Sequence, residues 1–265
     1  MLTFQINNAQ KTELKISTGY HFSSGSQYFI SDMDNSYNSF SSKRIDASLG
    51  RGLAIAAGIN YFFNSWMGIS TDIGYKKTMP AVSGKTEFNS FTDYSYSEEN
   101  KWNAELLEVS PALILKIPGN KINPYSKFGL VVPIYSKIKV TGNYSSRSFG
   151  MQTNTGENTK ILRLKNTIGY AASIGIAPEL KNKKFSLLAE IQLLSHSIQA
   201  KKSTLTSDIS NGVEKIDTYN TAAKETIYVK ELANQSYNPD EPRKEIGFSL
   251  PYSSIGLNIG LSIKL

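Results

Sequence analysis

The side chains best suited to acid–base chemistry are His21 and His196, the only two histidines in the chain. An imidazole can act as a general base toward water or a serine hydroxyl. Ser195, Ser197 and Asp46 are expected at a depth comparable to that of the histidines, which leaves room for a hydrolase site. No motif surrounds either histidine, so the sequence favours ordinary polar packing, and we predict no catalytic residue.

The composition excludes several other chemistries. The chain has no cysteine and two histidines, which leaves no disulfide, no thiol nucleophile and little material for a metal centre. We therefore expect no cofactor and no metal. The formal charge is +7, from 29 Lys and Arg against 22 Asp and Glu, but the basic residues are scattered, so we expect no nucleic-acid partner.

A second set of reactive side chains is a group of acids and bases that fall on the polar face of alternating segments. Opposite charges in a narrow polar interior usually neutralise one another, because unpaired buried charges are unfavourable. We predict that salt bridges between these residues plug the interior, and a proton or ion path is the alternative. The predicted network consists of Glu13, Lys15, Asp72, Lys76, Glu108, Lys116, Lys127 and Glu190, with Lys137 and Lys264 on the same face.

The elements that carry these residues have a two-residue period. In the clearest case, Ile255, Leu257, Ile259, Leu261 and Ile263 alternate with small or polar residues. This pattern is typical of a two-faced β-strand. Segments of this kind cover residues 11–22, 44–63, 66–79, 103–118, 124–142, 160–180, 184–203 and 246–265.

The connections between these segments alternate in length. Short turns are expected at 64–65, 119–123 and 181–183, and long polar loops at 23–43, 80–102, 143–159 and 204–245. The sequence therefore predicts an all-β fold, an eight-stranded antiparallel transmembrane β-barrel with short periplasmic turns and long extracellular loops in a bacterial outer membrane. The barrel covers residues 11–265, and residues 1–10 are a signal-peptide remnant or a disordered N-terminus. The alternative, a soluble barrel with an apolar interior, fits less well because the polar face is rich in small residues.

Aromatic residues are expected to form two girdles at the membrane interfaces. The short-turn girdle consists of Tyr61, Phe63, Trp66, Tyr125 and Phe185, and the long-loop girdle of Tyr20, Tyr75, Trp102, Tyr135 and Tyr252.

The loop at 204–245 is too long for a passive turn. Its Tyr219, Tyr228 and Tyr237 are the candidate contacts for a protein partner. Near the membrane rim, Arg44 and Arg51 are expected to pair with lipopolysaccharide phosphates. The expected partners are thus outer-membrane lipid, lipopolysaccharide and an envelope protein bound through extracellular loops or periplasmic turns.

Three stretches carry a resemblance to a known family. The segment LLEVSPALILKIPGNKINPYSKFGLVV at 106–132 resembles the fourth strand, turn and fifth strand of the PorT-like outer-membrane β-barrel family of Bacteroidetes-type bacteria. Residues 48–63 and 250–265 look like the second and last strands of that family, which has an eight-stranded barrel of the OmpA/OmpX type. The resemblance implies a non-enzymatic accessory or interaction subunit in protein secretion or envelope assembly. Alternatives are a surface adhesion or structural barrel, a rim hydrolase acting on lipid or peptide, and a narrow solute or ion channel.

Overall fold

The computed structural model describes residues 12–24, 27–36, 39–89, 95–118, 122–148, 153–165, 167–180, 184–232 and 237–265, and among these the side chains of 27–47 and 83–89 are outside the description. The predicted segment 1–10 therefore lies outside the described residues, as do the side chains of Asp46 and Arg44. No helix among the described residues is long and apolar enough to span a membrane.

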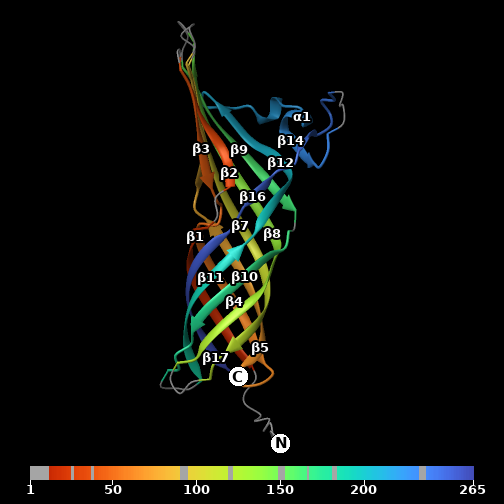
Figure 1. Cartoon of the computed structure of the whole chain (residues 1–265). Helices are drawn as coiled ribbons and strands as arrows, with labels where there is room; N and C mark the ends of the chain where they lie inside the picture. The colour runs from red at the N-terminus through yellow and green to blue at the C-terminus, as the bar shows by residue number, and fades with distance from the viewer. Residues whose placement is uncertain are drawn as a thin grey trace, which may run out of the picture.

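Eight strands in the described part of the chain form a closed ring, which confirms the predicted barrel (Figure 1). Each strand is antiparallel to the next, and the ring closes where β1 pairs with β17, from Glu13↔Lys264 to Ser23↔Ser254. In ring order the strands are β1 (Thr12–Ser23), β4 (Gly52–Phe62), β5 (Met67–Thr78), β7 (Ser95–Lys116), β8 (Pro124–Arg147), β10 (Gly169–Ile176), β11 (Phe185–Ser195) and β17 (Ser254–Lys264).

The two faces of the ring differ in polarity because side chains alternate along each strand. On β17, Leu257 and Ile259 point outward and are exposed, whereas Gly256 and Ser262 point inward and are buried. The same outward pattern on the other strands surrounds the ring with apolar side chains. An apolar belt around a polar interior is the architecture of outer-membrane barrels, so the predicted location in the bacterial outer membrane is confirmed.

Several strands continue far beyond the belt, into stretches that the sequence predicts as loops. β7 and β8 are 22 and 24 residues long, and their ladder reaches Ser95↔Arg147. The other strands of this extension are β2 (Gln27–Ser36), β3 (Ser39–Ala47), β6 (Ala81–Asn89), β9 (Asn154–Lys165) and β12 (Ser197–Ser210). The prediction of loops at 23–43, 80–102 and 143–159 was wrong in this respect. The polarity of these stretches suggested loops. Their Tyr and Thr residues favour strands, however, and pairing with neighbouring strands satisfies the hydrogen bonds of the backbone.

Irregular positions separate the membrane ring from this extension. The predicted segment 160–180 divides into β9 and β10, and 184–203 is interrupted at His196 between β11 and β12. The last segment likewise divides into β16 (Ser249–Pro251) and β17.

A bulge in β8 lies between the pairs Leu107↔Tyr135 and Glu108↔Pro133. The extra residue, Ile134, exchanges the two faces of the strand. Val131 and Pro133 are buried before the bulge, and Ile138 and Val140 after it. Lys137 was predicted in the lumen. It follows the bulge and lies on the opposite face to the buried Ile138 and Val140, so this prediction was wrong.

A lobe packs against β12 at the long-loop end (Figure 1). It consists of β13 (Val213–Glu214), the 3-10 turn η1 (Ile216–Thr218), the one-turn helix α1 (Thr221–Lys224), β14 (Glu225–Val229) and β15 (Arg243–Ile246). β14 pairs antiparallel with β12 and parallel with β15. The turn from β12 to β13 uses Asn211 and Gly212 with φ of 50° and 78°, a left-handed pair suited to a tight hairpin. The predicted loop 204–245 is thus a folded unit over much of its described length.

Candidate functional site: a closed lumen and an outer pocket

The centre of the lumen holds a group of linked ion pairs. Lys15 Nζ lies 2.6 Å from Asp72 Oδ2, and Lys127 Nζ lies 2.5 Å from Glu190 Oε2. Lys127 also lies 3.9 Å from Asp72, which joins the two pairs into one group. The group draws on β1, β5, β8 and β11, so it ties together strands that are not neighbours on the wall.

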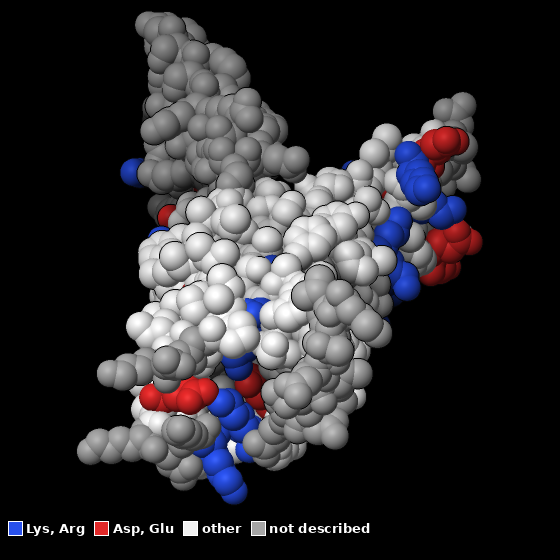
Figure 2. Space-filling view, turned by 60° about the horizontal axis from the view of Figure 1, so that its bottom comes forward, with Lys and Arg blue, Asp and Glu red and all other residues white. Residues whose placement is uncertain are grey.

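The other four residues of the predicted network also lie in ion pairs. Lys76 Nζ lies 3.0 Å from Glu108 Oε1, and Lys116 Nζ lies 2.8 Å from Glu13 Oε1. Lys264, predicted on the same face, pairs at 2.5 Å with Glu179, a residue that was not predicted to take part. The eight residues of the predicted network comprise four lysines and four carboxylates, so their formal charges sum to zero. Figure 2 shows basic and acidic side chains together at the short-turn end, below a flank of mostly uncharged residues.

Little free space remains among these charges. A cavity of about 50 Å³ is lined by Lys15, His21, Asp72, Lys76 and Glu108, together with other inward residues. That volume holds a few water molecules at most. The arrangement is therefore a polar filling of the barrel.

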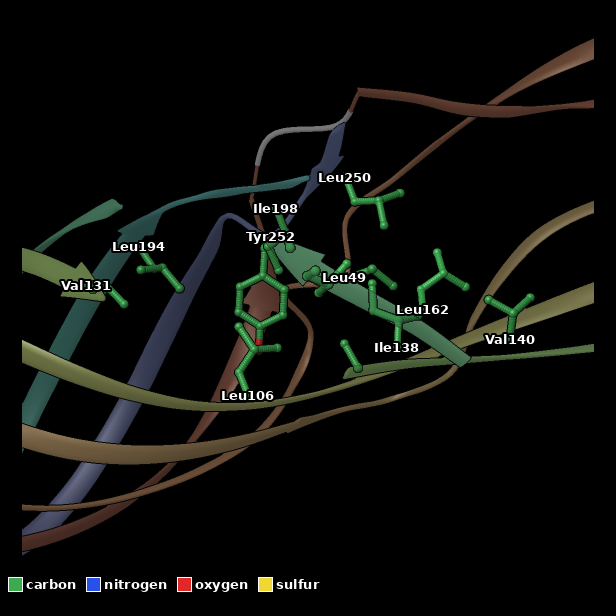
Figure 3. Close-up of a cluster of buried hydrophobic side chains, with 12 residues drawn as sticks. Leu49, Leu106, Val131, Ile138, Val140, Leu162, Leu194, Ile198, Leu250 and Tyr252 are labelled. Atoms are coloured by element: carbon green, nitrogen blue, oxygen red, sulfur yellow. The ribbon is translucent and has the colours of Figure 1, made fainter. Parts of the chain in front are cut away.

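An apolar cluster, here called the plug, closes the lumen toward the long-loop end (Figure 3). Leu106, Val131 and Tyr252 are at most 1% exposed. Leu49 joins them from the connection between β3 and β4, where its N–H donates to Pro251 O at 2.9 Å. The plug consists of Leu49, Ala104, Leu106, Val131, Ile138, Val140, Leu162, Leu164, Leu194, Ile198, Leu250 and Tyr252.

The short-turn end has a smaller apolar layer made of Phe62, Ile114, Tyr125 and Ala177. Lys116 Nζ lies 5.1 Å from the centroid of the Phe62 ring. The central charges thus lie in a lumen with apolar layers toward both ends. Neither layer was predicted, because apolar side chains were assigned to the membrane face.

Most residues of the predicted girdles point outward. Tyr61, Phe63, Trp66, Tyr75 and Tyr135 are exposed, and Tyr20 and Phe185 are half-buried on the outward face. Two edge-to-face ring pairs stabilise this surface, Tyr20 with Phe22 and Tyr61 with Phe63.

Tyr125, Trp102 and Tyr252 correct the girdle prediction, since all three point inward. Tyr125 has the same parity as Lys127, and its hydroxyl donates to Glu190 Oε2 at 3.0 Å. Trp102 shares the inward face of β7 with Ala104 and packs against the plug. Tyr252 lies at the break before β17, where its N–H donates to His196 O at 2.9 Å.

The histidines and serines of the alternative hydrolase site do not come together. His21 Nδ1 lies 3.1 Å from Ser254 Oγ, and His196 Nε2 lies 2.9 Å from Thr167 O. Both rings are buried, whereas Ser195 and Ser197 are exposed on the outer face. His196 serves here as a polar link at the break between β11 and β12, and His21 links β1 to the first residue of β17. In the part of the chain that the structure describes, no group of three His, Asp or Glu residues could hold a metal ion.

Above the plug lies an outer pocket of about 660 Å³, between the extended barrel wall and the lobe. Trp102, Tyr228 and Phe248 line it, with ring centroids 6.4 Å apart for Trp102 and Phe248 and 5.1 Å for Tyr228 and Phe248. Val140, Leu162 and Leu250 of the plug form its apolar floor. The pocket brings β7, β8 and β9 against a lobe that lies far away in sequence, and the polarity of the predicted loops gave no signal for it.

The three candidate loop tyrosines have different surroundings. Tyr228 lines the outer pocket, and its hydroxyl donates to Ser203 Oγ at 3.3 Å. The Tyr219 hydroxyl donates to Asp208 Oδ2 at 2.5 Å, and this hydrogen bond raises the pKa of Tyr219 to about 12. Tyr237 is 76% exposed, which leaves most of its ring available to a partner.

Comparisons with known proteins add one finding. No protein-family model and no curated protein matches the chain. Among solved structures, the chain is similar to outer membrane protein AlkL, determined by solid-state NMR in DMPC lipid bilayers, with 11% sequence identity, a TM-score of 0.36, and coverage of 100% of this chain and 96% of that one. The resemblance to the PorT-like family stays a prediction. The assignment as an outer-membrane barrel rests on the strand ring and its apolar belt.

Proposed function

We propose that this chain is a non-enzymatic outer-membrane barrel with a closed lumen, and that it acts as an accessory or interaction subunit in protein secretion or envelope assembly. The observation that carries the proposal is the filling of the lumen by paired charges and apolar layers. A barrel that is filled in this way is a scaffold for surfaces outside the membrane. The resemblance to PorT-like proteins supports the secretion or assembly context.

The filled lumen argues against a transport role. An eight-stranded barrel is about wide enough for its own side chains. A solute would have to displace the plug and separate several buried ion pairs, which is strongly unfavourable. Hydrolysis also has weak support, since His21 and His196 are 2% and 4% exposed and already hydrogen bonded.

The surface offered to a partner is the lobe and the extended strands beside it. Tyr237 combines a large ring with a hydroxyl that accepts from Asn220 Nδ2 at 3.0 Å. Exposed tyrosines of this kind are enriched in protein interfaces. Closer to the membrane, Arg51 Nε donates to Tyr20 Oη at 2.8 Å, and its position at the long-loop end suits a lipopolysaccharide phosphate.

Affinity purification of a tagged chain from native outer membranes in mild detergent tests the interaction role. We expect a stoichiometric envelope protein identified by mass spectrometry. A Tyr237→Ala variant should lose the partner if the lobe makes the contact, whereas Tyr61→Ala, on the lipid-facing surface at the other end, should retain it. Recovery of the barrel alone from wild-type membranes would overturn the accessory role and favour surface adhesion.

A further inference from the structure

The outer pocket has the size and enclosure of a small-molecule site. Its volume of about 660 Å³ falls in the range of ~300–1,000 Å³ that is usual for ligand pockets. Its walls come from β7, β8, β9 and β12 on one side and from α1, β14 and β15 on the other. The plug closes its floor, so a ligand here would stay on the outer side of the barrel.

The inner part of the pocket is apolar and aromatic. Trp102, Phe248 and Tyr228 form a chain of edge-to-face rings. Such rings favour a flat or chain-like apolar body, because its burial removes apolar surface from water. Phe248 is 36% exposed, so part of this apolar surface is uncovered in the free protein.

The charged groups of the pocket are biased toward cations. Its lining holds three cations, Lys160, Lys224 and Arg243, and two carboxylates, Glu98 and Glu245. Both carboxylates are engaged locally. Glu98 accepts from Tyr96 Oη at 2.6 Å and Asn100 Nδ2 at 3.0 Å, and Glu245 lies 3.2 Å from Arg243 Nε.

Lys160 and Lys224 make no ion pair with any carboxylate in the described residues. By contrast, the neighbouring Lys202 of β12 pairs with Glu225 of the lobe at 2.8 Å. Two ammonium groups beside an uncovered aromatic surface form a complementary site for a molecule with an apolar body and an anionic head. Charge-assisted hydrogen bonds from lysine to such a head are among the stronger polar contacts in proteins.

We propose that the outer pocket binds a water-soluble amphiphilic anion, with its apolar body against Trp102, Tyr228 and Phe248 and its carboxylate or sulfonate beside Lys160 and Lys224. The position of the pocket beyond the outward-facing Tyr20, Tyr75 and Tyr135 places it on the aqueous side of the membrane. This site is independent of the proposed accessory role, since it requires neither a partner protein nor a particular state of the lumen.

Calorimetric titration of the full chain in lipid nanodiscs tests the proposal, with 2-naphthoate as the probe and 2-naphthalenemethanol as its neutral counterpart. We expect 2-naphthoate to bind with one-to-one stoichiometry and the alcohol to bind about tenfold more weakly, because it lacks the charge. Equal affinity for the two probes, or no binding of 2-naphthoate above that of empty nanodiscs, would overturn the proposal.

Variants separate the pocket from the rest of the lobe. Lys224→Gln should weaken 2-naphthoate binding about tenfold, and Lys224→Arg should restore most of it. Lys230→Gln is the matched control, because Lys230 is an exposed lysine of the same lobe and does not line the pocket. Phe248→Ala should weaken binding of both probes. If Lys230→Gln has the same effect as Lys224→Gln, the binding reflects general surface charge and the assigned site is wrong.

Discussion

Lys127 and Glu190 meet at 2.5 Å inside the barrel, although β10 lies between their strands on the wall. The contact is therefore made by side chains inside the lumen and is independent of the ladder hydrogen bonds. It is reinforced by Tyr125, which donates to the same carboxylate oxygen and whose ring centroid lies 5.5 Å from Lys127 Nζ. This three-residue group holds β8 and β11 at a fixed separation.

Removing one partner of this group should destabilise the barrel strongly. Lys127→Met leaves Glu190 buried without its counter-ion, and we expect a loss of about 3 to 5 kcal/mol in the free energy of unfolding. Urea titration in detergent, read by tryptophan fluorescence, measures the change. Lys77→Met is the control, because the Lys77–Glu105 pair is 4.0 Å apart and its lysine side chain is 60% exposed. An equal effect of the two variants would contradict the importance of the Lys127–Glu190 contact.

The plug should control both stability and closure. Leu106→Ala removes a fully buried side chain, so we expect a loss of about 2 to 5 kcal/mol, whereas Leu113→Ala on the lipid-facing side should lose less. In planar bilayers the wild-type chain should give no steady single-channel openings, and Leu106→Ala combined with Tyr252→Ala should give measurable ion current. Steady openings of the wild-type chain would show that the lumen conducts.

The hydrogen bond between Tyr219 of the lobe and Asp208 of β12 should be lost at high pH. This hydrogen bond raises the pKa of the Tyr219 hydroxyl from about 10 to about 12. The hydrogen bond therefore stabilises the fold fully below pH ~10 and is lost as the pH rises through 12. Absorbance titration of tyrosinate should show one fewer high-pKa group in Tyr219→Phe, and Asp208→Asn should return that group to lower pH. An unchanged titration in Asp208→Asn would contradict this assignment.

An acid-side transition should arise from Glu214 in the same hairpin. The hydrogen bond from Ser207 Oγ, at 2.6 Å, is the main cause that lowers the pKa of Glu214, and backbone N–H donors at Asp208, Lys215 and Ile216 add to it. Because the pKa is lowered, this contribution to stability is present above the ordinary value of about 4.3 and is lost as the pH falls through the lowered value. Limited proteolysis across pH 3 to 6 should show protection of the β12–β13 hairpin falling toward acid, and Glu214→Gln should show little pH dependence in this range. A wild-type profile identical to that of Glu214→Gln would exclude this role.

Sequence patterns predicted the ring well because alternation records which residues share a face. Glu13, Lys15 and Lys127 could be placed inside on that basis alone. The same patterns could not locate the bulge at Ile134 or the breaks near His196 and Tyr252, where backbone pairing changes locally. Tyr252 lies at one of those breaks, and the bulge turns Ile138 and Val140 inward, so this part of the plug could not be read from alternation. Trp102 was missed for a different reason, because it has the inward parity of Glu108 on β7 but was assigned to a girdle as an aromatic residue.

The closing ladder between β1 and β17 has a consequence for how the molecule is made. The backbone N–H of Leu265 donates to Thr12 O at 3.0 Å, so the seam joins residues that are almost the whole chain apart in sequence. Contacts of such large sequence separation form slowly, because the loss of chain entropy precedes the gain from pairing. Until they form, β1 and β17 are two open edges with apolar sides, which is the arrangement most prone to pairing with other molecules. Protection of these two edges during assembly is therefore a requirement set by the topology itself.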